Sequence, residues 1–122
     1  MTGRDEAEMA EADLSVRARI AYLGAKKPYR RVFDHHGWGH VHEKWTDMAQ
    51  RGETAAMGNL VDDEMLHTFA VVAEPEHVAS AIVERYAGLS DRASVMTPYA
   101  TVQDLWDSIG AGIRAYRNGI PA

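Results

Sequence analysis

The densest group of potentially reactive side chains lies between Asp34 and His42, where four histidines occupy positions 35, 36, 40 and 42. Imidazole nitrogen is a good ligand for zinc, iron, nickel and copper, so a metal site is the first interpretation to test. Glycines at positions 37 and 39 oppose it, because they interrupt the helix that would place His36 and His40 on one face. We therefore interpret the segment as a loop whose histidines line a pocket or form hydrogen bonds, and we predict no metal there.

Two Glu-x-x-His pairs have the spacing that di-iron sites in helix bundles use. Glu64 and His67 fall within a predicted helix, whereas Glu74 precedes Pro75 and is expected outside the helix that includes His77. The two further carboxylates of such a site have no obvious helix to come from. A small helical binding module, or a His/Glu metal-binding module, therefore stays an alternative function.

A basic segment separates Asp13 from Asp34, and it contains no acidic residue. Its positive side chains are Arg17, Arg19, Lys26, Lys27, Arg30 and Arg31. Such a patch could hold a phosphate or a polycarboxylate. We favour the simpler interpretation, in which the cations complement the C-terminal end of a helix and stay solvated.

Composition limits the classes of function. A chain of 122 residues that is 46% hydrophobic and 25% charged is typical of one soluble domain. Its net charge of −5 argues against a nucleic-acid binder, and zero cysteines exclude disulfides and thiol catalysis. No apolar run is long enough to cross a bilayer, and the opening is acidic, so we expect a cytoplasmic protein with no membrane partner.

Apolar residues at helical spacing, together with capping residues, predict that most of the chain is α-helical. Thr2 with Asp5 resembles a capping box for the first helix. Gly110 and Gly112 weaken the last helix by about 1 kcal/mol each relative to alanine, so packing must hold it together. The expected helices cover residues 4–23, 28–37, 38–52, 53–58, 62–69, 75–87 and 101–117.

One segment, Arg92–Met96, reads as a convincing strand, which Thr97 and Pro98 end. The apolar run Phe69–Ala73 is either a short strand or the end of a buried helix. A single strand cannot form a sheet, and unpaired buried backbone groups are costly. We therefore expect partner strands from outside this sequence or from another copy of the chain.

Three stretches resemble the C-terminal third of luciferase-like flavin- or deazaflavin-dependent oxidoreductases: Pro28–Gly39, Leu60–Val78 and Glu84–Arg92. The resemblance covers residues 4 to 117. It implies an α/β fold, with this chain as the C-terminal fragment of a TIM barrel over residues 1–122. Arg92–Met96 would then be the eighth barrel strand. One departure is Ala73, where the family usually has glycine.

The resemblance also implies a function. The parent activity would be hydride transfer between coenzyme F-420 or FMN and a small organic substrate, and the partner would be the missing N-terminal half of the barrel. No catalytic residue is carried over, because most coenzyme contacts in the family come from earlier strands. His35, His36 and Trp38 are the candidates for lining the substrate pocket, since active sites of this fold lie in the loops after the strands. We expect this chain alone to bind neither coenzyme tightly.

Overall fold

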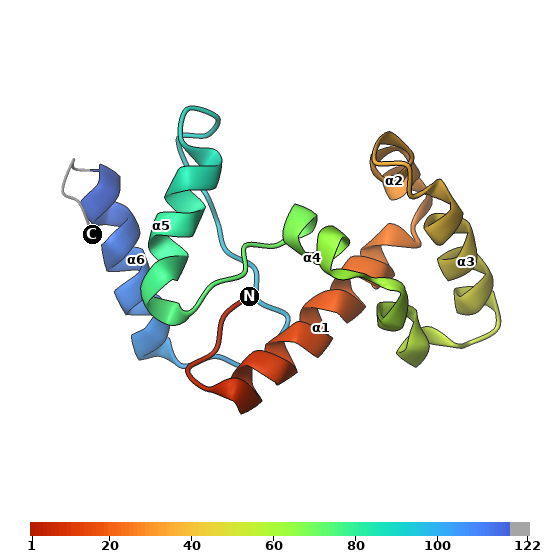
Figure 1. The fold of residues 1–122 in the computed structure, drawn as a ribbon, viewed down its shortest axis with the longest axis horizontal. Helices are drawn as coiled ribbons and strands as arrows, with labels where there is room; N and C mark the ends of the chain where they lie inside the picture. Colours follow the sequence, from red (N-terminus) through yellow and green to blue (C-terminus); the bar gives the residue numbers. More distant parts are fainter. Residues whose placement is uncertain (118–122) are drawn as a thin grey trace. The chain divides into compact units, whose positions relative to one another are not determined.

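The computed structural model describes residues 1–117, which form helices joined by loops (Figure 1). The helices are α1 (Glu6–Gly24), α2 (Arg30–His35), α3 (Gly39–Gln50), α4 (Asp63–Phe69), α5 (Pro75–Tyr86) and α6 (Gln103–Arg117), with two short 3-10 helices, η1 (Lys27–Tyr29) and η2 (Thr54–Leu60). Each lies where the sequence predicts a helix. The chain divides into two compact units, of which one is Leu14–Phe69 and the other joins Met1–Asp13 to the residues from Ala70 onward.

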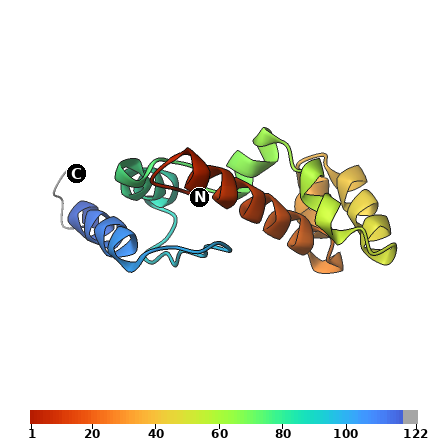
Figure 2. The ribbon, with the colours of Figure 1, turned by 90° about the horizontal axis from the view of Figure 1, so that it is seen from below.

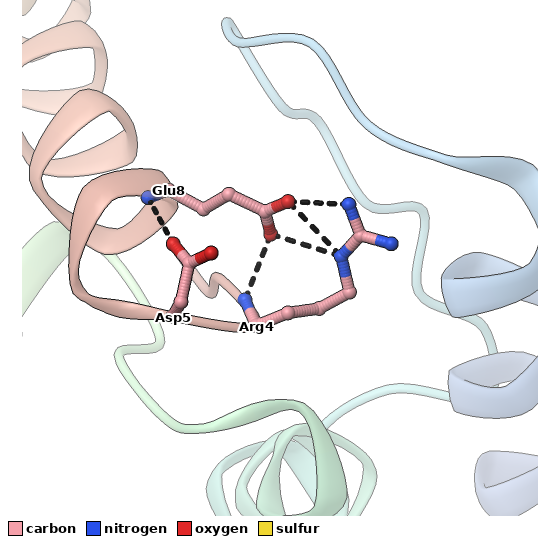
Figure 3. Close-up of polar contacts among 3 residues, drawn as sticks. All are labelled: Arg4, Asp5 and Glu8. Atoms are coloured by element: carbon pink, nitrogen blue, oxygen red, sulfur yellow. Dashed lines mark hydrogen bonds and ion pairs between the residues drawn. The ribbon is translucent and has the colours of Figure 1, made fainter.

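A capping box begins α1, one turn later than the sequence predicts. The backbone N–H of Glu8 donates to Oδ1 of Asp5 at 2.8 Å, and the backbone N–H of Arg4 donates to Oε2 of Glu8 at 2.8 Å. The Arg4 guanidinium also pairs with the Glu8 carboxylate (Figure 3). Hydrogen bonds from Arg4 lower the pKa of Glu8 to about 2. Asp5 is therefore the capping residue, and Thr2 is not.

The core of the unit that contains both chain ends lies between α5 and α6, which run side by side (Figures 1 and 2). Val78 and Ile82 of α5 are buried against Ile109 of α6. A Cβ atom on Gly112 would lie only 2.8 Å from Cβ of Ala79, so the missing side chain lets the two helices approach closely. This contact supplies the packing that a helix with two glycines requires.

The unit Leu14–Phe69 is built around Trp45, which is completely buried. Its indole Nε1–H donates to the carbonyl of Met57 at 2.8 Å, and its ring meets Phe33 edge to face at 5.2 Å. Gly24, the last residue of α1, lies against both rings: a Cβ atom there would stand 2.5 Å from Trp45 Cζ3 and 2.8 Å from Phe33 Cζ. The end of α1 therefore fits into the aromatic core only because residue 24 has no side chain.

The predicted strand at Arg92–Met96 is wrong, and with it the α/β fold class and the TIM-barrel fragment. Within residues 1–117 the structure has helices and no strand, and residues 92–97 belong to an irregular connection between α5 and α6 (Figure 2). A strand is defined by a neighbour that accepts and donates its hydrogen bonds, and no backbone–backbone hydrogen bond joins 92–96 to another described residue. The carbonyl of Arg92 instead accepts from the hydroxyl of Ser90.

The apolar run at Phe69–Ala73 resolves into two parts. Phe69 ends α4, and residues 70–74 that follow it belong to neither a helix nor a strand. There the terminal ammonium of Met1 donates to the carbonyl of Val71 at 2.6 Å, and the N–H of Ala73 donates to the carbonyl of Met1 at 3.2 Å.

Among the described residues, no helix is long and apolar enough to cross a membrane.

Candidate pocket wall around Trp38

The loop that carries Trp38 depends on two glycines for different reasons. Gly37 has a φ of 78°, in the left-handed region that side chains disfavour. Gly39, the first residue of α3, faces the carboxylate of Asp34, whose Oδ1 would lie 2.2 Å from a Cβ atom at that position. The glycines thus end α2 and begin α3 within three residues, and Trp38 is the residue that caps α3 in the turn between the two helices.

Three aromatic side chains form what we call the aromatic ledge: His36, Trp38 and Phe69. The His36 imidazole stacks on the Trp38 indole, with ring centroids 4.8 Å apart and planes at 20°. Phe69, from the end of α4, meets both rings at 6.0 Å. Beneath the ledge, Phe33 contacts Trp38 and Phe69 and joins them to the buried Trp45.

Exposure increases outward across this ring cluster. Trp45 and Phe33 are 0% and 3% exposed, Trp38 is half-buried, and Phe69 is 37% exposed. The ledge is therefore a surface of flat rings held rigidly from below by the core. Stacked or edge-to-face aromatic contacts contribute about 0.5–1.5 kcal/mol beyond burial, so such a surface suits a planar apolar ligand.

The structure brings together two of the three residues that the sequence predicts for a pocket wall. His36 and Trp38 belong to the ledge, while the exposed His35 ring meets His36 edge to face at 5.2 Å. Sequence reasoning missed Phe69, since its place at the start of an apolar run gave no sign that it would turn toward a loop about thirty residues earlier.

The remaining histidines of the segment have separate surroundings. His42 is 6% exposed, and its Nδ1–H donates to the carbonyl of Gly24 at 2.6 Å. The bond provides a donor for a carbonyl at the end of α1 that has no partner within the helix. His40 is exposed on the first turn of α3. In the described part of the chain these histidines form no group of three ligand atoms.

One group of potential metal ligands does occur among residues 1–117. Glu74, Glu76 and His77 each place a ligand atom within 4.8 Å of the others, at the start of α5, and all three are exposed. As the sequence predicts, Glu74 precedes the helix. The other Glu-x-x-His pair, Glu64 and His67, lies on α4 and is not part of this group.

Two arginines of the basic segment, Arg17 and Arg30, form contacts between helices. Arg17 donates to the carbonyl of Val61 at 2.6 Å and pairs with Asp63 at 2.5 Å, which lowers the pKa of that carboxyl. Arg30 pairs with Glu43 at 2.9 Å. These contacts hold α1 to the start of α4 and α2 to α3. The predicted role is wrong for these arginines, because the last turn of α1 contains no basic residue and both side chains are paired with carboxylates.

Comparison with known proteins identifies longer relatives. Three curated proteins match, each named as an uncharacterized protein: two from Mycobacterium tuberculosis, strains H37Rv and CDC 1551, and one from Mycobacterium bovis. Each is 44% identical over 91 residues, which are 75% of this chain and 27% of the relative. The chain thus spans about a quarter of the length of these relatives. No protein-family model and no solved structure matches it.

Proposed function

We propose that this chain lines the substrate pocket of a luciferase-like oxidoreductase, as one part of a longer functional protein. The observation that carries the proposal is the aromatic ledge, which presents stacked rings to solvent at the segment where the sequence resembles that family. The relatives add support, because the matched region makes up only 27% of their length. Polypeptide outside this region would then supply most of the enzyme.

In this proposal, the chain's own residues position an organic substrate. Trp38 offers a rigid apolar face, His36 covers part of it and provides ring nitrogens for hydrogen bonds, and Phe69 closes one edge. Because Phe33 and Trp45 support these rings from below, the ledge needs little rearrangement to receive a ligand. Ligand binding on such a preformed surface loses less conformational entropy than binding on flexible side chains.

A bound F-420 or FMN would supply the hydride transfer. The exposed rings of the ledge fit one face of a flat organic molecule, whereas a tightly held coenzyme also requires an opposite wall and phosphate contacts. We therefore assign the ledge to the substrate and expect the 122-residue chain to bind either coenzyme more weakly than micromolar, a threshold of about −8 kcal/mol.

A chimera tests the proposal: the Mycobacterium tuberculosis relative with its matched region replaced by this chain. F-420 and FMN would be titrated into the relative and the chimera, and oxidation of the reduced coenzyme would be followed with a panel of organic substrates. Loss of stacking in Trp38→Ala should raise KM about 2- to 10-fold and leave coenzyme affinity unchanged. Tyr22→Ala, which removes an exposed aromatic outside the ledge, is the matched control. If neither coenzyme binds the relative, the proposal is wrong.

The alternative, a His/Glu metal-binding module, is favoured by the group Glu74, Glu76 and His77. It ranks second because these side chains are exposed and because the positive end of the α5 dipole disfavours a cation. Calorimetric titration of the chain with Zn²⁺ and Mn²⁺ tests it. Glu74→Gln should abolish binding and Glu64→Gln should not; equal affinities in the two variants would reject this site.

A further inference from the structure

Two cations of the basic segment lie over one exposed aromatic ring. The guanidinium carbon of Arg19 lies 5.6 Å from the ring centroid of Tyr22, and the ammonium nitrogen of Lys26 lies 4.4 Å from the same centroid. Tyr22 is 53% exposed, and both cations are exposed as well. Because the electron-rich face of an aromatic ring attracts cations, the ring holds these two flexible side chains near one another. We call the three residues the cation clip.

Neither cation of the clip is neutralised within the described chain. Two other arginines of the basic segment pair with carboxylates. Arg19 and Lys26, in contrast, form no ion pair with another residue of 1–117. On a helix the usual partner is a carboxylate three or four positions away, and positions 14–33 contain no acidic residue. The clip therefore brings two positive charges together and leaves both available to an anion.

Further positive charge follows the clip in the sequence. Lys27 begins η1, and Arg31 lies in the first turn of α2. Both are exposed, and neither forms an ion pair with a described residue. The whole chain has a net charge of −5, so this segment is a local concentration of positive charge in an acidic protein. Since the attraction grows with the charge of the ligand, a dianion is bound more tightly here than a monoanion.

We propose that the cation clip is a binding site for a phosphate group. The Arg19 guanidinium presents paired N–H donors that match two phosphate oxygens, and the Lys26 ammonium adds a point charge with three donors. A phosphate monoester carries a charge of about −1.5 to −2 at pH 7, more than a carboxylate carries. The phosphate belongs either to a small soluble molecule or to the headgroup of an anionic lipid, and the experiment separates these two sources.

Titration of the 122-residue chain with pyrophosphate at low ionic strength, followed by amide NMR spectra, tests the site. The signals of Arg19, Tyr22 and Lys26 should shift together and saturate at low-millimolar concentration. Arg19→Gln and Lys26→Gln should each weaken binding at least about 5-fold, because each removes a charge-assisted hydrogen-bond donor. Lys44→Gln, which removes an exposed cation of α3, is the matched control and should change the affinity by less than about 2-fold.

Substitutions of Tyr22 separate the clip from a diffuse positive surface. Tyr22→Leu keeps both charges but removes the ring that positions them, so it should weaken binding about 2- to 5-fold, while Tyr22→Phe should bind as the original does. Circular dichroism of each variant separates loss of binding from loss of folding. The inference is overturned if Tyr22→Leu binds as tightly as the original, if Lys44→Gln weakens binding as much as Lys26→Gln, or if no signal saturates.

Two further arms identify the source of the phosphate. Binding of glycerol phosphate without sedimentation on phosphatidylcholine vesicles that contain phosphatidic acid assigns the site to a small soluble molecule. Sedimentation that Lys26→Gln abolishes assigns it to a lipid headgroup. Acetate that binds as tightly as glycerol phosphate would overturn the preference for phosphate. The clip shares no residue with the aromatic ledge, so Tyr22→Ala should weaken phosphate binding and leave KM for the organic substrate unchanged.

Discussion

The contact between Gly24 and the aromatic core predicts that Gly24→Ala destabilises the protein. In most helices this substitution is favourable, because alanine exceeds glycine in helix propensity by about 1 kcal/mol. At position 24, however, the new methyl group would lie 2.5 Å from Trp45 Cζ3 and 2.8 Å from Phe33 Cζ. Both atoms belong to rigid rings that are buried, so neither can move aside freely.

The expected size follows from two opposing terms. Overpacking of a filled core costs about 1–3 kcal/mol, and the gain in propensity is smaller than its mid-helix value because residue 24 ends α1. We expect a net loss of about 1–2 kcal/mol. Gly110→Ala is the matched control: the nearest atom to its Cβ would be Nη1 of Arg114 at 3.3 Å, the far end of a flexible side chain. That variant should gain up to about 1 kcal/mol.

Urea unfolding followed by tryptophan fluorescence and circular dichroism measures both variants. Equal m-values would show that the difference lies in the free energy of unfolding and not in the extent of the transition. A Gly24→Ala protein as stable as the original would refute the close packing of α1 on Trp45. If Gly110→Ala also lost stability, a general intolerance of alanine would explain the result instead.

Four further predictions follow from individual contacts. Gly112→Ala should cost about 1–3 kcal/mol in urea unfolding, because its methyl group would meet Ala79 at 2.8 Å. Trp45→Phe should cost at least about 1–3 kcal/mol by leaving the Met57 carbonyl without its donor, and an unchanged midpoint would contradict that hydrogen bond. The low pKa of Glu8, about 2 against an ordinary 4.5, gives stability that is present above pH 4.5 and lost between pH 4.5 and 2; acid unfolding of Glu8→Gln should lack this dependence. Burial raises the pKa of Tyr99 above 10.0, so its contribution is intact below pH 10.0 and lost as the pH rises beyond it; Tyr99→Phe should flatten the alkaline side of the stability curve.

The helices could be predicted from the sequence because their signals are local. Pro75 at the first turn of α5 and Asp62, whose Oδ1 accepts from the N–H of Met65 at 2.8 Å, act within one turn of themselves. The sequence predicts the N-terminal cap of α1 one turn too early, because Thr2 and Asp5 have the spacing of a capping box but Asp5 and Glu8 have it as well. Thr2 is instead buried, with its N–H bonded to Tyr99.

The candidate site and the strand depend on contacts that no local pattern records. His36 and Trp38 are two residues apart in the sequence and can be grouped from it, whereas Phe69 is about thirty residues away and meets them only in the folded structure. Likewise, the composition of Arg92–Met96 favours extended backbone, and only the absence of a neighbour among the described residues decides that it is not a strand. Pairing is a property of two segments, and the sequence of one cannot determine it.

The division of the chain has a consequence for the order in which it folds during synthesis. Leu14–Phe69 is continuous, so its aromatic core can close as soon as residue 69 leaves the ribosome. The other unit must join Met1 to Val71 and Thr2 to Tyr99, contacts that span 70 and 97 residues, and its α6 follows both pairs in the sequence. Contacts of such separation form slowly, since the entropy of a long loop is lost before any packing is gained. We therefore expect the nascent chain to pass through a state in which the core around Trp45 is folded and Met1–Asp13 have not yet formed their contacts with the later residues of their unit.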